Sequence, residues 1–246
     1  MVNMDELRKK HKEINKASGG TSDFLAKFFM MDEGTSVVRI LPGGDPEEQF
    51  YAETAIHRIE ENGSWKNYHC PRVKGGDCPI CDFYFRLWKT DSEANHNLAR
   101  SIKARKRYYA NVVDRRDGKV KILSVGMKLF GKILDCFFDE DYGDITDTEK
   151  GWDFKVVKDT IGQFPNYDKS SPKPKQTAAG TDSEIATWMD ELHDIHGLVQ
   201  LPTYDDMKKV VMNLAGDAPT TKDSTPSESN NSEDEDYLSH LKNIDS

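Results

Sequence analysis

The chain has 246 residues, of which 36% are hydrophobic and 31% are charged, and its formal net charge is −9. This composition allows one sizeable folded domain with further segments outside the core. No apolar run approaches the roughly 20 residues that a membrane helix needs. Residues 1–16 are charged throughout, which is unlike a secretory signal peptide. We therefore expect a soluble intracellular protein without a membrane partner.

The net charge conceals two oppositely charged segments. Residues 100–121 contain nine basic and two acidic side chains, whereas residues 217–246 contain eight acidic and two basic ones. The acidic total therefore does not exclude a polyanionic partner. We expect a basic N-terminal arm over residues 1–20, a folded core over 21–216 and a disordered acidic tail from residue 217 to the end.

Short strands are predicted in the first two thirds of the chain. Segments rich in β-branched and aromatic residues cover 36–42, 50–60, 64–68, 107–113, 119–125 and 152–158. Asn62-Gly63 and Asp117-Gly118 each separate two of these segments, as expected of tight hairpin turns. The strands are therefore predicted to form antiparallel pairs.

Helices are predicted between and after the strands. Apolar residues recur at helical spacing over 129–137, 185–195 and 207–214, and Thr203 with Asp206 resembles a capping box before the last of these. The fold class is thus mainly β with appended helices (α+β). An OB-fold, a five-stranded Greek-key barrel, is the commonest such barrel among nucleic-acid binders, and we expect it here.

Three of the four cysteines lie close together in the sequence. Cys78 and Cys81 form a CxxC pair, a spacing that lets two thiolates bind one zinc ion, and Cys70 lies eight residues earlier. In a reducing compartment such a group indicates metal ligands, with a redox-active pair or simple buried thiols as the alternatives. Cys136 falls on the apolar face of a predicted helix and is expected in the core.

The fourth metal ligand is either His57 or His69. Because His69 is adjacent to Cys70, both side chains can reach one tetrahedral ion only with a distorted backbone. The Asn-Gly turn that follows His57 returns the chain beside it, which favours this residue. We expect one structural zinc ion (Zn2+) in a subdomain of about residues 57–90. Its ligands would be His57, Cys70, Cys78 and Cys81.

An enzymatic reading of the same residues is weaker. Zinc-dependent nucleobase deaminases carry H-x-E followed by P-C-x-x-C and keep one coordination position open for water. Here Glu60 lies one residue too far from His57, Pro79 lies inside the cysteine pair, and Cys70 would close the open position. We therefore expect no enzymatic activity.

A basic stretch leads directly into aromatic residues. Cations bind phosphates and aromatic rings stack on bases, so this mixture is typical of sequence-independent single-strand binding. The alternative is a solvated basic strand whose tyrosines belong to the core. Two further aromatics lie in the Gly/Pro-containing segment GQFPNYD, where they either stack on bases or plug the end of the barrel. The candidate residues are Lys103, Arg105, Lys106, Arg107, Tyr108, Tyr109, Phe164 and Tyr167.

Six sequence features carry a family resemblance: VVRILP, the spacing of twelve residues between a histidine and a cysteine, CPIC, RKRYYANVV, GKVKIL and GQFPNYD. In sequence and order they resemble the gene-32-type single-stranded DNA-binding proteins of T-even-like phages, over nearly the whole chain. The resemblance implies an OB-fold core with a zinc subdomain. It also implies cooperative, sequence-independent binding of single-stranded DNA in replication, recombination and repair, in the cytoplasm of a phage-infected bacterium.

The resemblance also assigns roles to residues. It implies the same four zinc ligands and the same eight DNA-binding residues. At Ala99 and Leu123 this chain lacks tyrosines that the family has, which implies a smaller stacking surface. The implied partners are single-stranded DNA, further copies of the protein along the strand, and replication and recombination proteins that the acidic tail recruits. The self-association residues would be Arg8, Lys9, Lys10 and Lys12.

One non-enzymatic alternative remains open. In a zinc-containing protein-interaction scaffold, the basic strand would bind acidic protein partners instead of DNA. Charge docking does not need exposed aromatic rings, so the aromatic residues distinguish the two functions.

Overall fold

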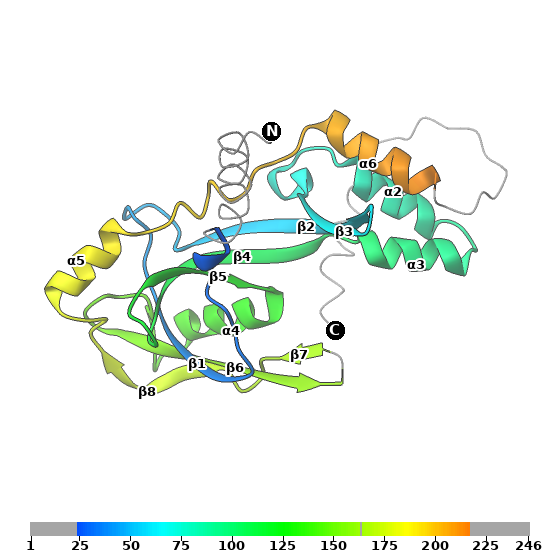
Figure 1. Cartoon of the computed structure of the whole chain (residues 1–246). Helices are drawn as coiled ribbons and strands as arrows, with labels where there is room; N and C mark the ends of the chain where they lie inside the picture. The colour runs from blue at the N-terminus through cyan, green and yellow to red at the C-terminus, as the bar shows by residue number, and fades with distance from the viewer. Residues whose placement is uncertain (1–23, 163, 217–246) are drawn as a thin grey trace, which may run out of the picture.

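The computed structural model describes residues 24–162 and 164–216, and Figure 1 shows their arrangement. In this part of the chain, eight strands pair antiparallel in one curled sheet with the order β3-β2-β4-β1-β6-β7, with β5 paired to β4 and β8 paired to β6. The strands are β1 (Gly34–Ile40), β2 (Tyr51–Glu61), β3 (Ser64–His69), β4 (Arg105–Asp114), β5 (Val120–Val125), β6 (Gly151–Ile161), β7 (Phe164–Asn166) and β8 (Ser171–Thr177). The mainly β class is confirmed.

Six strands were predicted, and β7 and β8 are additional. The sequence of β8, SPKPKQT, contains two prolines and does not resemble a strand. Proline is tolerated where a backbone N–H faces away from a partner strand, as at the edge of a sheet. β8 pairs only with β6, and the register of this ladder shifts between Trp152 and Phe154, opposite the segment that contains Pro174.

Both predicted hairpin turns are present. Asn62 and Gly63 have φ values of 52° and 74°, the left-handed pair that a two-residue hairpin turn requires. The turn fixes the register in which His57 lies opposite Tyr68. In the β4–β5 hairpin, Gly118 has a φ of 69° and donates its N–H to the carbonyl of Asp114 at 2.8 Å.

Strand β4 is the centre of the sheet. Its first half pairs with β2, from Arg105 to Ala110, and its end pairs with β1, where Asp114 lies opposite Val38. The other edge of β4 pairs with β5. The strand that carries the basic residues is therefore held on both edges over most of its length, and only its first three residues are exposed.

The main hydrophobic core lies inside the curl of the sheet, against helix α4 (Met127–Phe138). Tyr108 of β4 stacks on Phe130 of α4, with ring centroids 3.9 Å apart and planes inclined by 8°. Leu123, one of the positions where the family has tyrosine, is fully buried in this core. Cys136 is also buried here, as predicted.

A second core belongs to what we call the cysteine lobe: the β2–β3 hairpin, the 3₁₀ helix η1 (Pro71–Lys74) and the helices α2 (Pro79–Trp88), α3 (Glu93–Ile102) and α6 (Tyr204–Gly216). The predicted cap of α6 is present, because Thr203 Oγ1 accepts the N–H of Asp206 at 3.2 Å. Met207, Val210 and Val211 of α6 are buried in this core. Residues distant in sequence therefore complete the lobe.

Helix α5 (Asp182–Asp190) is shorter than the predicted 185–195 segment. Beyond it, Asn111 of β4 exchanges two hydrogen bonds of 3.0 Å with the backbone of His193. These bonds hold the chain in a non-helical path along the sheet, where Ile195 is buried against Tyr109 and its neighbours. Tertiary contacts thus override the helical periodicity.

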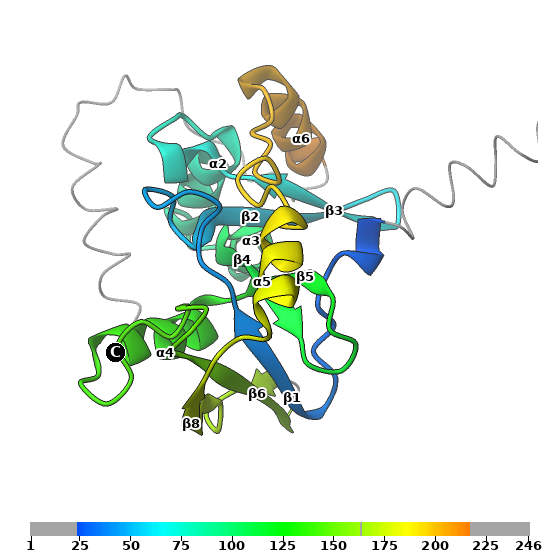
Figure 2. The same ribbon diagram turned by 90° about the vertical axis from the view of Figure 1, so that its left-hand side faces the viewer.

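Figure 2 shows α5 in front of the strands at one end of the molecule.

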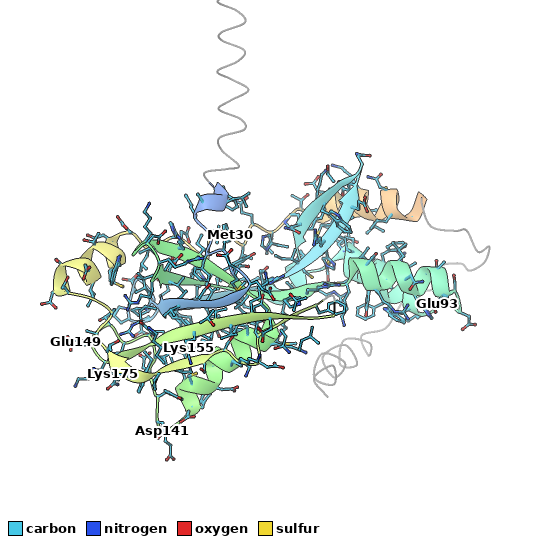
Figure 3. The ribbon with its side chains drawn as sticks, turned by 60° about the horizontal axis from the view of Figure 1, so that its bottom comes forward. Met30, Glu93, Asp141, Glu149, Lys155 and Lys175 are labelled. Carbon is cyan, nitrogen blue, oxygen red and sulfur yellow. The ribbon has the colours of Figure 1, made fainter. Side chains whose placement is uncertain are left out.

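The cysteine lobe lies at the opposite end of the sheet from α5 (Figure 1). Glu93 marks the outer tip of this lobe, and Lys155 and Lys175 lie on β6 and β8 of the main sheet (Figure 3). Within the described residues, no helix combines the length and apolarity needed to cross a bilayer.

Candidate metal centre and nucleic-acid interface

Four buried side chains converge in the cysteine lobe. One ligand atom each from His57, Cys70, Cys78 and Cys81 lies within 4.8 Å of all the others. His57 comes from β2, Cys70 follows β3, Cys78 caps α2 and Cys81 lies in its first turn. The structure therefore brings together the four residues predicted from the sequence as one cluster that is compatible with a metal ion.

The distances suit tetrahedral coordination. The sulfurs of Cys70 and Cys81 are 3.5 Å apart, and Nε2 of His57 lies 3.3 Å from Cys78 Sγ and 3.5 Å from Cys81 Sγ. In a tetrahedral zinc site with bonds of ~2.3 Å to sulfur and ~2.0 Å to nitrogen, the corresponding separations are about 3.8 and 3.5 Å. The four positions would all be filled by protein, as in a structural site.

The orientation of His57 is fixed by the residue that precedes the basic segment. Its Nδ1–H donates to the backbone carbonyl of Ile102 at 2.7 Å. A carbonyl can only accept, so the proton lies on Nδ1 and the lone pair of Nε2 faces the three sulfurs. Metal-binding histidines commonly have such a second hydrogen bond.

The grouped thiols alter one another's ionisation. Hydrogen bonds from Cys78 and Cys81 lower the pKa of Cys70 to about 3. Hydrogen bonding to the other two sulfurs, together with burial and the neighbouring negative charge, raises the pKa of Cys81 far above its usual value. Without a cation, the three buried thiols do not all ionise, because their negative charges would repel one another. A divalent metal ion would supply the compensating positive charge.

His69, the alternative ligand, has a different role. Its Nδ1 lies 2.8 Å from Thr54 Oγ1, and it is not part of the four-residue cluster. Burial lowers the pKa of His69, which favours the neutral ring at physiological pH. The preference for His57 over His69 thus agrees with the geometry.

We call residues 103–107 the basic segment. Lys103 is half-buried at the end of α3, and Arg105, Lys106 and Arg107 are exposed at the start of β4. Lys106 forms an ion pair of 3.2 Å with Glu53 of the neighbouring strand. This carboxylate was not anticipated from the sequence, because the pairing of β2 with β4 that brings it here joins residues about fifty positions apart.

Tyr108 and Tyr109 point to opposite sides of β4, but both are buried. Tyr108 lies in the main core against Phe130, and Tyr109 lies in the outer core that includes Ile122 and Ile195. Each ring is only 7% exposed. Their predicted contact with DNA stays a prediction, and the structure assigns both a packing role.

Phe164 and Tyr167 lie on or beside β7, which forms a hairpin arm with the end of β6. Phe164 is 76% exposed, whereas Tyr167 is partly buried against the main core. Burial raises the pKa of Tyr167, and the nearby positive charge of Arg107 opposes this rise. The packing of Tyr167 against the main core was not indicated by any sequence spacing.

The predicted self-association residues Arg8, Lys9, Lys10 and Lys12 and the acidic tail lie outside the described residues. Ala99, the other position where the family has tyrosine, is fully buried in the cysteine lobe. A tyrosine at this position would have to displace core residues, so the smaller side chain is consistent with the packing of this lobe.

Comparison with known proteins identifies relatives over most of the chain. The single-stranded DNA-binding protein of Enterobacteria phage T4 is 26% identical over 199 residues, covering 73% of this chain and 65% of that protein. The phage T2 protein of the same name is 27% identical over 167 residues, covering 61% and 54%. A probable ssDNA-binding protein of Escherichia phage T5 is 26% identical over 229 residues, covering 81% and 85%.

The chain thus spans between about half and two thirds of the length of the T2 and T4 relatives. The family described as gp32 DNA binding protein like matches residues 32–214. This match runs from just before β1 into α6 and includes the metal cluster, the basic segment and the hairpin arm. The chain therefore belongs to the gp32-like DNA-binding protein family.

Proposed function

We propose that this protein binds single-stranded DNA without sequence preference and has no catalytic activity. The observation that carries the proposal is the exposure of three cations at the start of β4, together with the exposed ring of Phe164 on the hairpin arm. Cations can hold successive phosphates while exposed rings stack on bases of any sequence. Membership of the family supports the same function.

The residues proposed to contact DNA have different access to it. Lys103, Arg105, Lys106 and Arg107 supply positive charge, and Phe164 supplies the most exposed ring. Tyr167 contributes the part of its ring that is not buried. Tyr108 and Tyr109 can take part only through their exposed edges or after a local rearrangement, because they are enclosed by the two cores.

We further propose that the four-residue cluster binds one structural zinc ion. Thiolate and imidazole ligands in a tetrahedral arrangement suit zinc, and four protein ligands leave no position for a reactive water. His57, Cys70, Cys78 and Cys81 would hold the ion. It would then join the β2–β3 hairpin to α2 and stabilise the lobe that adjoins the basic segment.

The remaining parts of the proposal concern the whole chain. We assign the curled sheet to the OB-fold class, with residues 21–216 as the binding core. Residues 1–20 would contact a neighbouring copy through Arg8, Lys9, Lys10 and Lys12, giving cooperative binding along the strand. The acidic tail would recruit replication and recombination proteins in the phage-infected bacterial cell.

The first test is a titration of the intrinsic fluorescence of the four tryptophans and nine tyrosines. Oligothymidylate, duplex DNA and heparin are compared over a range of salt concentrations. Quenching by oligothymidylate that duplex DNA does not match, with affinity that falls steeply with salt, supports single-strand binding. Equal responses to all three polyanions would refute it and favour the scaffold function.

A second test concerns the tail. Opposite charges on residues 217–246 and the basic segment allow the tail to compete with DNA. Deleting the tail should raise the affinity for oligothymidylate and make it less sensitive to salt. Unchanged affinity and salt dependence would contradict this competition.

A further inference from the structure

The tip of the hairpin arm exposes two large apolar side chains. Ile161 is 64% exposed and Phe164 is 76% exposed. They lie opposite each other in the last pair of the β6–β7 ladder, so their side chains project from the same face. Among the described residues, neither belongs to any of the hydrophobic clusters, and Ile161 has no role in the DNA contact proposed above.

The polar residues next to the apolar pair form local contacts with one another. Asp159 and Asn166 form the ladder pair two positions along, on the same face as the apolar pair. The carboxylate of Asp159 forms an ion pair of 2.7 Å with Lys169, and the amide of Asn166 donates to Asp168 at 2.8 Å. Lys169 thus compensates Asp159, while Asp168 adds a second carboxylate beside Asn166.

The apolar pair lies on the same hairpin arm as the aromatic residues that are proposed to contact DNA. Tyr167 packs against the main core, to which Tyr108, the residue after Arg107, also belongs. Phe164 is three residues from Tyr167, a span of at most ~11 Å. Ile161 lies about 5 Å across the ladder from Phe164. The arm also projects toward the end of the molecule that holds the cysteine lobe (Figure 1). Ile161 therefore adjoins a ring that is already proposed to contact DNA.

We propose that Ile161 and Phe164 form an apolar pincer that takes one unstacked base of the bound strand. This inference rests on the proposed single-strand binding and adds Ile161 to the residues that perform it. Phe164 stacks on the face of the base, and Ile161 contacts its edge or sugar. Both contacts are apolar, so the pincer favours a base that is not paired in a duplex. For the same reason it does not add to the salt-dependent, electrostatic part of the affinity.

The test is the Ile161→Thr variant, which keeps a β-branched side chain on the strand and replaces an ethyl group with a hydroxyl. We expect the affinity for a short oligothymidylate to fall about five- to tenfold. The slope of log affinity against log salt concentration should not change. Leu201→Thr, at another exposed apolar residue (43% exposed) in a loop, is the matched control and should bind as the unaltered protein does.

A double-mutant cycle with Phe164→Ala tests whether the two residues contact one base. If they do, the double variant loses less affinity than the two single losses predict. Independent losses, an unchanged affinity of Ile161→Thr, or a reduced salt slope would each overturn the pincer. So would a change in the association state of the free protein, which would identify the tip as a contact between copies. Failure of the unaltered protein to bind oligothymidylate would instead refute the proposed function.

Discussion

Replacing Asp114 with asparagine should loosen the strand that carries the basic segment. Asp114 ends β4, and its side chain is 1% exposed. Its carboxylate accepts hydrogen bonds from Arg116, at 2.8 to 3.1 Å, and from Lys121 of β5, at 2.7 Å. These bonds hold the β4–β5 hairpin in register at the end of the strand that is farthest from Arg105.

The size of the effect follows from the ionisation of Asp114. Burial alone would raise its pKa, but the hydrogen bonds from Arg116 and Lys121 outweigh burial and lower the pKa to about 2. Relative to an unfolded value near 3.9, this difference corresponds to about 2 to 3 kcal/mol of folding free energy at neutral pH. Because the folded pKa is the lower one, this stabilisation is complete above about pH 4 to 5 and is lost as the pH falls through 2.

Urea unfolding of the two proteins between pH 3 and pH 7 provides the measurement. Asp114→Asn should lower the free energy of unfolding by about 2 to 3 kcal/mol at pH 7, and the difference should shrink as the pH falls toward 3. Asp45→Asn, at an exposed aspartate, is the control and should change little. A difference that is the same at every pH would refute the electrostatic explanation, and no difference at pH 7 would refute the anchoring role.

Three further predictions concern the metal, the charge and the core. Removing zinc with a chelator should expose residues 57–102 to proteases while β6 and β8 stay protected, and equal resistance of both forms would contradict a structural ion. Arg105→Gln should reduce the salt slope of single-strand binding by about 0.7, and an unchanged slope would place this side chain away from the phosphates. Tyr108→Leu removes a ring stacked on Phe130 and should lower the free energy of unfolding by about 2 kcal/mol. Unchanged stability with lost DNA binding would show that the ring stacks on bases instead.

The metal cluster could be predicted from sequence because its determinants are local. A CxxC pair at a helix start, one earlier cysteine and a tight turn limit the possible geometries, and the Asn62-Gly63 turn then selects His57 over His69. The hairpins and the mainly β class were predictable for the same reason. The residues of a tight turn and the alternation of side chains between the two faces of a strand are both set within a few residues of sequence.

Other features depend on contacts between distant segments. Glu53 reaches Lys106 only because β2 pairs with β4, and Tyr167 packs against the main core only because the sheet curls. The burial of both tyrosines of β4 has the same origin. Alternation predicts that Tyr108 and Tyr109 face opposite sides, but it does not show that each side of this strand is covered.

The metal centre and the basic segment are joined by a short chain of contacts. His57 faces the three sulfurs with Nε2 and holds the carbonyl of Ile102 with Nδ1. Ile102 ends α3, and the exposed cations begin three residues later, at Arg105. A metal ion on His57 would therefore fix the point at which the chain enters β4 without contacting DNA itself. The lobe can thus contribute to binding by positioning the cations, and four protein ligands around an ion would suit it to that structural role.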